Sequence, residues 1–189
     1  EFNEKIFALH FNKYVPKTLI TSNIEKIKDF YELHKKIIVK PLDGMGGISI
    51  YKIDDLNEDN LNIINEMTNS EQTKIICQEF LEDIYDGDFR VLIIHGEPFE
   101  KTLARIPQKG NFKGNLAAGG KGIAMDISDF QRKLGEEIGE YLIKMGINFA
   151  GIDIIGEYLT EINITSPTCA REIYEQTGIN PITRYFEGL

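Results

Sequence analysis

One stretch of the chain could place two arginines and an aspartate around an anion. If Gly96 and Glu97 form a two-residue hairpin turn, Asp88 lies opposite Arg105, and Arg90 is two residues from Asp88. Residues that are opposite or two apart share a face of the sheet. Two guanidiniums on that face could bind carboxylate or phosphate oxygens through paired hydrogen bonds. Taken alone, the pattern fits a surface hairpin with a cross-strand ion pair better.

A second predicted hairpin carries oxygen-bearing side chains. A three-residue turn over Gly156–Tyr158 places Asp153 opposite Glu161, with Asn163 on the same face. A two-residue turn would turn Asp153 away and mix charge into the apolar face, so we prefer the three-residue turn. Two carboxylates and an amide oxygen suit Mg²⁺. A solvated hairpin face is the alternative.

A lysine precedes a glycine-rich loop at the end of another predicted strand. Lys40 is followed by Gly44, Gly46 and Gly47. Glycines let backbone N–H groups approach phosphate closely, and lysine adds a positive charge. The loop is neither a Walker motif nor a dinucleotide fingerprint, because the required residues do not follow it. A tight turn that needs glycine explains the loop alone about equally well.

Helices and strands that mix along the chain must position these residues. Several neighbouring strands read as antiparallel hairpins, which predicts an α+β fold. A glycine-rich loop, 107–125, is long enough to indicate a functional segment. The predicted helices are 24–36, 56–69, 128–145 and 171–177, with helix also in the last residues, and the strands are 37–40, 48–53, 74–80, 89–94, 99–106, 148–155 and 159–164.

Composition excludes some classes of protein. The formal net charge is −9, which argues against a protein that mainly binds nucleic acid. No apolar run approaches the roughly 20 residues of a membrane-spanning helix. Cys77 and Cys169 match no zinc or redox spacing, so free thiols in a cytoplasmic protein are expected. Because the chain begins at Glu1 and not at Met, we expect it to begin inside a larger protein.

Several motifs together resemble the bacterial glutathione synthetase family, and their order and spacing agree over essentially the whole chain. This resemblance implies an ATP-grasp fold, in which two α+β lobes with mostly antiparallel sheets enclose the nucleotide. It assigns 1–82 to the small lobe with a preceding segment and 83–189 to the catalytic lobe. The motifs are Lys40–Gly47, Asp86–Arg90, Leu103–Pro107, Gly114–Gly120, Asp153–Gly156 and Thr160–Thr168.

The resemblance also implies a reaction. The family joins γ-glutamylcysteine and glycine through an acyl phosphate, converting ATP to ADP and phosphate, with Mg²⁺ or possibly Mn²⁺ as the metal. It implies a cytoplasmic protein, a homo-oligomer at full length, without nucleic-acid or membrane partners. The family has an upstream domain that this chain lacks, so these residues alone are not expected to turn over efficiently. A different ATP-grasp carboxylate–amine ligase, or a non-catalytic Mg-ATP-binding fragment, stays as an alternative.

Residue roles follow from the same resemblance. Lys5, Lys40 and the glycine loop match residues that contact ATP phosphates, although Lys5 could equally be a solvated terminal lysine. Asp88 is expected near the ribose. The adenine segment is matched by Gln78, Glu79, Phe80 and Leu81.

The substrate side is assigned in the same way. Arg90 and Arg105 match arginines that face the acyl phosphate and the developing oxyanion. The magnesium ligands would be Asp153, Glu161 and Asn163. The loop 107–122 matches a mobile lid, in which Asn115, Gly119 and Gly120 would contact the substrate. The acceptor end of the substrate would lie near Ser166, Pro167 and Thr168.

Overall fold

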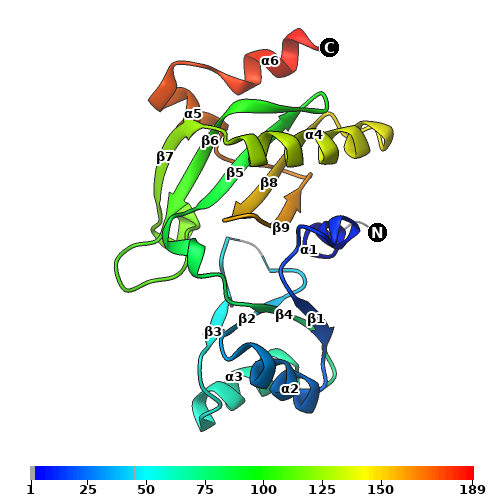
Figure 1. The fold of residues 1–189 in the computed structure, drawn as a ribbon, viewed down its shortest axis with the longest axis vertical. Coiled ribbons are helices and arrows are strands. Elements are labelled where there is room, and N and C mark those ends of the chain that lie inside the picture. Colours follow the sequence, from blue (N-terminus) through cyan, green and yellow to red (C-terminus); the bar gives the residue numbers. More distant parts are fainter. Residues whose placement is uncertain (1–2, 45) are drawn as a thin grey trace. The chain divides into compact units, whose positions relative to one another are not determined.

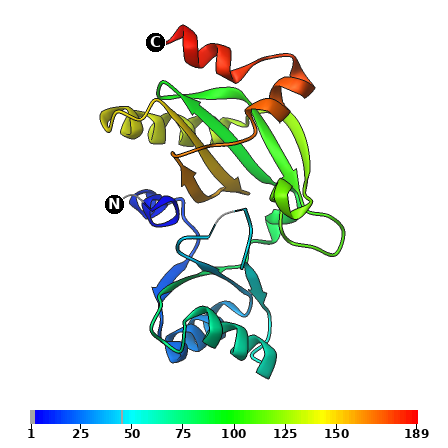
Figure 2. The ribbon, with the colours of Figure 1, turned by 180° about the vertical axis from the view of Figure 1, so that it is seen from behind.

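The computed structural model describes residues 3–44 and 46–189, and these form two compact units (Figures 1 and 2). The small unit is Val15–Glu82, and the large unit joins the segment that ends at Tyr14 to Asp83–Leu189. The predicted lobes, 1–82 and 83–189, stay a prediction. The Leu159 N–H donates to the Tyr14 carbonyl, 2.8 Å away, within the large unit.

The small unit is an antiparallel sheet with its strands in the order β1-β4-β2-β3. Helices α2 and α3 lie on one side of this sheet in Figures 1 and 2 and contribute Ile27 and Ile64 to its core. Strand β4 is interior and almost fully buried, as its continuous apolar stretch predicts. The elements are β1 (Thr18–Thr21), α2 (Ile24–His34), β2 (Ile37–Pro41), β3 (Tyr51–Ile53), α3 (Glu58–Met67) and β4 (Ile75–Glu79).

The large unit is built on an antiparallel sheet with strands in the order β7-β6-β5-β8-β9. Two hairpins therefore meet along β5 and β8, which are far apart in the sequence. The strands are β5 (Asp88–Ile94), β6 (Glu97–Ile106), β7 (Lys121–Asp126), β8 (Phe149–Ile155) and β9 (Tyr158–Asn163).

Helices cover both faces of this sheet. Helix α4 packs against β5 and β6, and α5 packs against β6 and β7 from the opposite side (Figures 1 and 2). Ser128 and Gln131 form a reciprocal capping box that begins α4. The helices are α1 (Glu4–Phe7), α4 (Asp129–Lys144), α5 (Ala170–Thr177) and α6 (Pro181–Glu187), with the short 3₁₀ turns η1 (Ala8–Phe11), η2 (Glu82–Tyr85) and η3 (Leu116–Ala118).

The first predicted hairpin has the expected pairing but a different turn. Asp88 pairs with Arg105, as predicted, whereas the turn is His95–Gly96 and not Gly96–Glu97. Both turn residues have positive φ, +50° and +83°, which a two-residue turn of this hand requires. A register shift between Val91 and Ile93 compensates for the moved turn.

The second hairpin shows the same combination. Asp153 pairs with Glu161, as predicted, but Ile155 pairs with Tyr158, so the turn has two residues and not three. A bulge after Asp153 supplies the extra residue on β9. The predicted face of oxygen donors is therefore present for a different local reason.

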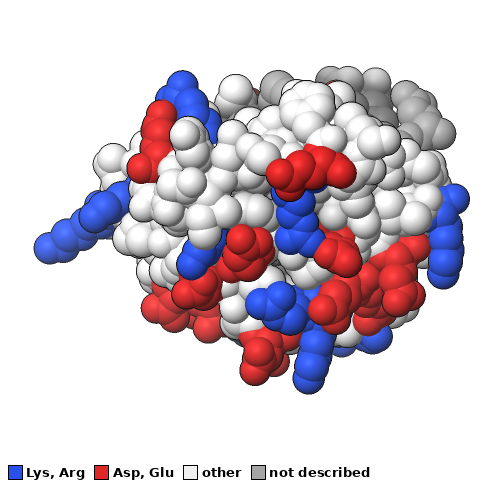
Figure 3. Space-filling view, turned by 90° about the horizontal axis from the view of Figure 1, so that it is seen from above, with Lys and Arg blue, Asp and Glu red and all other residues white. Residues whose placement is uncertain are grey.

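Other differences lie at sheet edges. Sequence reasoning missed β1 and β7, which are edge strands whose partly exposed residues give no clear apolar alternation. Within 3–44 and 46–189, no helix is long and apolar enough to span a membrane. Acidic and basic side chains are interspersed on the face in Figure 3.

Candidate functional site

Functional side chains from three strands lie in one row across the large sheet. Arg90 on β5 pairs directly with Asp153 on β8, and Asp153 pairs with Glu161 on β9. Arg90 also shares its face with Leu92, because alternate residues of a strand point the same way. The two motifs that the sequence suggested separately are therefore parts of a single site.

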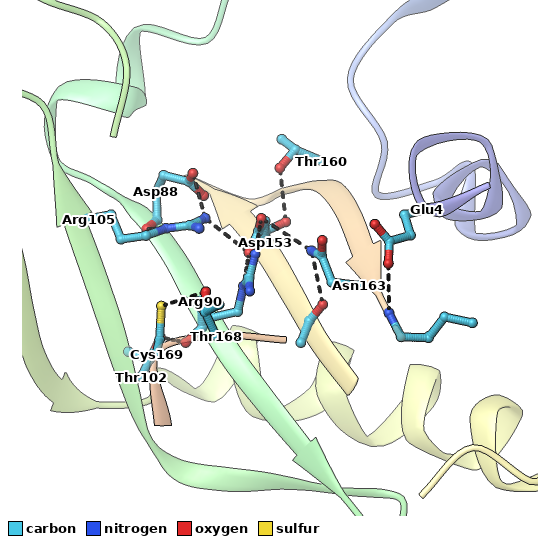
Figure 4. A network of polar contacts seen from close by, with 12 residues as sticks. Glu4, Asp88, Arg90, Thr102, Arg105, Asp153, Thr160, Asn163, Thr168 and Cys169 are labelled. Atoms are coloured by element: carbon cyan, nitrogen blue, oxygen red, sulfur yellow. Dashed lines mark hydrogen bonds and ion pairs between the residues drawn. The ribbon is translucent and has the colours of Figure 1, made fainter. Parts of the chain in front are cut away.

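Two guanidiniums converge on Asp153 (Figure 4). Arg90 binds Asp153 in a fork: its Nη2 donates to Oδ2 over 2.8 Å, and its Nε donates to Oδ1. Arg105 Nη2 lies 3.0 Å from Asp153 Oδ1 and 2.6 Å from Asp88 Oδ2, although neither contact has hydrogen-bond geometry. Arg105 thus bridges two carboxylates.

Backbone contacts fix both arginines. Arg105 Nε donates to the Asp88 carbonyl over 3.2 Å, and the Thr102 hydroxyl donates to the Arg90 carbonyl over 2.8 Å. Sequence reasoning did not single out Thr102, and no motif marks it. The bond to the Asp88 carbonyl orients the Arg105 guanidinium, and the Thr102 bond holds the Arg90 backbone, whose guanidinium is oriented by Asp153.

Burial and charge give the two aspartates opposite protonation behaviour. Asp88 is 8% exposed and Asp153 is 3% exposed. Burial raises the pKa of Asp88 to about 6, with Arg105 opposing the shift and Asp153 adding to it. Burial would also raise the pKa of Asp153, but Arg105 and Arg90 outweigh it and hold that pKa well below its usual range. Asp153 has two guanidinium partners and Asp88 has one.

Asp88 has an unused acceptor. Its Oδ1 is buried and has no hydrogen-bond partner among the described residues. A buried, unpartnered carboxylate oxygen is unusual in a native fold. No described contact bears on the expected position of Asp88 near the ribose, which stays a prediction.

The first helix adds a lysine to the same row. Lys5 Nζ lies 3.2 Å from Glu161 Oε1, and the Lys5 side chain is only 10% exposed, so it is not a solvated terminal lysine. Its neighbour Glu4 accepts bonds from the Ile164 and Thr165 N–H groups at 3.2 and 3.4 Å. Helix α1 is thereby anchored to the end of β9.

The segment after β9 lies against Arg90. A Cβ on Gly151 would approach Arg90 Cδ to 2.8 Å and Pro167 Cβ to 3.0 Å, so Pro167 and Arg90 pack over the same glycine. Ser166 and Thr168 are exposed beside it. Cys169 follows, buried, with the left-handed φ of +86°, and its Sγ lies 3.7 Å from the Thr168 hydroxyl. Sequence reasoning treated Cys169 only as a free thiol.

The glycine-rich loop after β6 is shorter than predicted. It ends at Lys121, where β7 begins, instead of at residue 122 or 125. Gln108 Nε2 donates to the Gly119 carbonyl over 2.8 Å, and the Gly120 N–H donates to the Asn115 carbonyl over 3.1 Å. The loop also touches Asp88, since a Cβ on Gly114 would meet Asp88 Cβ at 3.0 Å.

In the small unit, Lys40 and the glycine loop follow one another as expected. Lys40 lies on β2 and is 9% exposed. Gly46 and Gly47 have positive φ, +64° and +79°, a conformation that glycine adopts without strain. Met45 lies outside the described residues. The next strand begins at Tyr51 and not at Ile48, and a cavity of about 450 Å³ is lined by Pro41, Asp43, Gly44, Ile48, Ser49 and Met67.

The predicted adenine segment lies at the end of β4. Gln78 Nε2 donates to the Thr18 hydroxyl over 2.9 Å, and Glu79 Oε1 accepts from the Lys17 N–H over 2.8 Å. The Phe80 N–H donates to the Lys36 carbonyl over 3.0 Å. Adenine recognition by Gln78–Leu81 stays a prediction.

Comparison with known proteins decides the family. The sequence matches the ATP-grasp domain of prokaryotic glutathione synthetase over residues 4–178. The chain belongs to this family. It is 49% identical over 189 residues to glutathione synthetase of Buchnera aphidicola subsp. Baizongia pistaciae, covering 100% of this chain and 58% of that protein. It is 48% identical over 172 residues to that of Vibrio parahaemolyticus, covering 90% and 54%.

The chain spans a little more than half the length of these curated relatives. Solved structures show the ATP-grasp fold. The ligase PsnB, complexed with a phosphomimetic variant of its minimal precursor, Mg and ADP, gives a TM-score of 0.68 at 19% identity, covering 98% of this chain and 57% of PsnB. D-alanyl-alanine synthetase A of Vibrio cholerae gives 0.67 at 15%, covering 98% and 62%. The predicted family and α+β ATP-grasp fold are confirmed.

The donor set of this glutathione synthetase family member fits a hard cation. Asp153 and Glu161 supply carboxylates, and Asn163 Nδ2 lies 3.5 Å from Asp153 Oδ2, so its amide reaches the same point. Rotating that amide by half a turn would present its oxygen. No three His, Cys, Asp or Glu side chains gather as a metal site in the described chain. Two carboxylates and one amide oxygen are nevertheless enough for Mg²⁺, which keeps several waters.

Proposed function

We propose that the full-length protein is a glutathione synthetase. It would join γ-glutamylcysteine and glycine to glutathione while converting ATP to ADP and phosphate. Family membership and relatives named glutathione synthetase support this activity. The observation that carries it is the row of Arg90, Asp153 and Glu161, in which anion-binding and cation-binding groups are adjacent.

The proposed reaction needs a carboxylate to become an electrophile. Phosphoryl transfer from ATP to the cysteinyl carboxylate makes an acyl phosphate, and the glycine amine then displaces phosphate. Arg90 and Arg105 would bind the oxygens that gain charge in these steps. The Asp88 carbonyl holds the Arg105 guanidinium, and the Asp153 carboxylate holds that of Arg90.

Nucleotide and metal would be held by residues assigned from the family. Lys5, Lys40, Gly44, Gly46 and Gly47 would contact the phosphates, Gln78–Leu81 the adenine, and Asp88 the ribose. Asp153, Glu161 and Asn163 would hold Mg²⁺ or Mn²⁺, which supplies charge neutralisation on the phosphates. Loop residues Asn115, Gly119 and Gly120 would cover the substrate and exclude water from the acyl phosphate. Ser166, Pro167 and Thr168 would contact the acceptor end.

Our proposal for the whole protein also covers its setting. We place it in the cytoplasm as a homo-oligomer that binds small molecules and neither nucleic acid nor membrane. Two buried free cysteines and the net charge of −9 support this setting.

Coupled ADP release on the full-length protein tests the function. With γ-glutamylcysteine present, we expect sustained ADP release only when glycine is added. Release with a different amine but not with glycine would replace the proposed acceptor. Binding of ATP without release under any of these conditions would support the non-catalytic alternative.

A further inference from the structure

Three cations and three carboxylates form a charge cluster in the large unit: Lys5, Arg90, Arg105, Asp88, Asp153 and Glu161. Lys5 pairs with Glu161, Arg90 with Asp153, and Arg105 with both aspartates. The formal charges of these six groups sum to zero. The side chains of Arg90, Arg105 and Asp153 are 4–6% exposed, so water contributes little screening there.

This neutral cluster should resist a single added charge. An anion placed on the arginines would leave an excess of buried negative charge, and a divalent cation placed on the carboxylates would leave an excess of positive charge. Uncompensated buried charge is strongly unfavourable. If the anion and the cation bind together, the cluster can stay close to neutral. The cation would then take the place of the arginines beside Asp153, and the anion would take the place of Asp153 beside the arginines.

We propose that Asp153 and Glu161 occupy the anion-binding groups of the resting site, and that they release those groups when a divalent cation binds. Asp153 would release Arg90, and Glu161 would release Lys5, so metal and anionic substrate would bind by one exchange of partners. The inference rests on the proposed function for the identity of the substrate. It adds to that function a resting state in which the two subsites block each other.

The geometry of the pairs supports such an exchange. Arg90 already forms with Asp153 the forked arrangement that it would form with a substrate carboxylate. Arg105 would keep a partner, since Asp88 lies 2.6 Å from its Nη2. The exchange therefore requires rotation of side chains and no refolding of the strands.

The exchange predicts reciprocal coupling between the two ligands. Coupled sites in proteins commonly change each other's affinity by 5- to 150-fold. We expect Mg²⁺ to raise the affinity for the anionic substrate on the order of tenfold. The anion must raise the affinity for Mg²⁺ by the same factor.

Isothermal titration calorimetry on the full-length protein measures this coupling between Mg²⁺ and the anion under conditions in which no reaction takes place. γ-Glutamylcysteine and, separately, inorganic phosphate are titrated without nucleotide, in Mg²⁺ or in EDTA. For the wild type we expect about tenfold tighter binding of each anion in Mg²⁺. Asp153→Asn should bind anions more tightly than the wild type in EDTA, and should lose the effect of Mg²⁺. If Asp153 served only as a metal ligand, its substitution would not raise the affinity for anions in EDTA.

Glu161→Gln provides a second test. The Glu161 side chain is 23% exposed, so loss of its charge should not prevent folding. It should also tighten metal-free phosphate binding, through release of Lys5. The matched control is Glu137→Gln, which removes the partner of Lys13 in an exposed pair of 2.9 Å and should change neither affinity.

Three possible results distinguish failure of the proposed exchange from failure of the proposed function. Equal wild-type affinities in Mg²⁺ and EDTA would overturn the exchange. So would metal-free affinities of Asp153→Asn and Glu161→Gln that match the wild type, and Glu161→Gln decides alone if Asp153→Asn does not fold. If phosphate shows the coupling while γ-glutamylcysteine does not bind at all, the proposed substrate is wrong and the exchange stands.

Discussion

Asp88 and Asp153 are chemically identical residues in opposite electrostatic situations. Both are buried beside Arg105, but only Asp153 has a second, forked guanidinium partner. Burial raises the pKa of Asp88 to about 6 against its single guanidinium, whereas at Asp153 two guanidiniums outweigh burial and lower the pKa. Asp153 is therefore fixed as a carboxylate at physiological pH, whereas Asp88 is the member of the cluster that can take up a proton near neutrality.

The pKa of Asp88 makes stability depend on pH. Because the folded pKa is above the ordinary value of 3.8, the protonated form contributes stability that is complete below about pH 4 and lost as the pH rises through about 6. Asp88→Asn, which stays neutral, should gain about 3 kcal/mol over the wild type between pH 4 and 7. Urea unfolding of both proteins across this range measures the difference. A difference independent of pH would show that Asp88 titrates normally.

Arg105→Ala should separate chemistry from nucleotide binding. The change leaves Asp88 without its guanidinium, so we expect a loss of stability of about 3–5 kcal/mol as well as loss of ligation. Mg-ATP binding to the folded fraction should be largely retained, because Arg105 is not among the residues proposed to contact the nucleotide phosphates or the metal. Arg184→Ala is the control, since Arg184 is a partly exposed arginine whose Nη1 lies 3.6 Å from Glu100. Equal loss of ligation and Mg-ATP binding would contradict the role given to Arg105.

Glu161→Gln should raise the Mg²⁺ concentration that gives half-maximal ligation. A neutral amide binds a divalent cation less well than a carboxylate, and Gln would still fit the space beside Lys5. Titration of Mg²⁺ at saturating substrates measures the shift, with Glu137→Gln as the control of the same chemistry in an exposed pair. If the two titrations coincide, Glu161 is not a metal ligand.

At the scale of elements, the sequence predicts pairing better than it predicts turns. The pair Asp153–Glu161 follows from alternation of apolar residues, which a one-residue slip would reverse. The pair Asp88–Arg105 was predicted from an assumed two-residue turn at Gly96–Glu97 and is present although the turn lies elsewhere. Both turns were misplaced because each hairpin contains a bulge, and an extra residue inside a strand leaves no mark in the apolar pattern.

The contact between the two hairpins could not be predicted from residue patterns. Arg90 and Asp153 are opposite each other because β5 and β8 are neighbours in the sheet. Local patterns do not specify which strands from different hairpins become neighbours. Family resemblance gave the residues and their roles, but it gave no indication that Asp153 would be held by both arginines.

Helix α5 supports the strand that leaves the glycine-rich loop. Gln176 Oε1 accepts from the Ala124 N–H over 2.9 Å, and its Nε2 donates to the Gly122 carbonyl over 3.3 Å. Gln176 thus satisfies the outer edge of β7 as a neighbouring strand would. Gln176→Ala should weaken this edge by about 1 kcal/mol, which corresponds to roughly fivefold faster hydrogen exchange at Ala124. Exchange at Leu92 in the central strand is the internal control, and an unchanged rate at Ala124 would show that Gln176 does not secure β7.

Among the described residues, each of the two units has hydrophobic core residues of its own. Ile27, Ile64 and Cys77 belong to the core of the small unit, while Leu92 and Ile173 belong to a core of the large unit. The proposed ATP ligands are divided between these units, since Lys40 belongs to the small unit and Lys5 to the large unit. Each unit can therefore report separately on whether it contributes to nucleotide binding.

This division gives a calorimetric prediction for the full-length protein. We expect Mg-ADP to raise the unfolding temperature of the protein, because a ligand that binds only the folded state stabilises that state. At 100 times its Kd the ligand should add about 2.7 kcal/mol. Differential scanning calorimetry with adenosine in place of Mg-ADP is the control for the phosphates, and Lys40→Ala should reduce the Mg-ADP shift. A shift that Lys40→Ala leaves unchanged would contradict the proposed contact of Lys40 with the nucleotide.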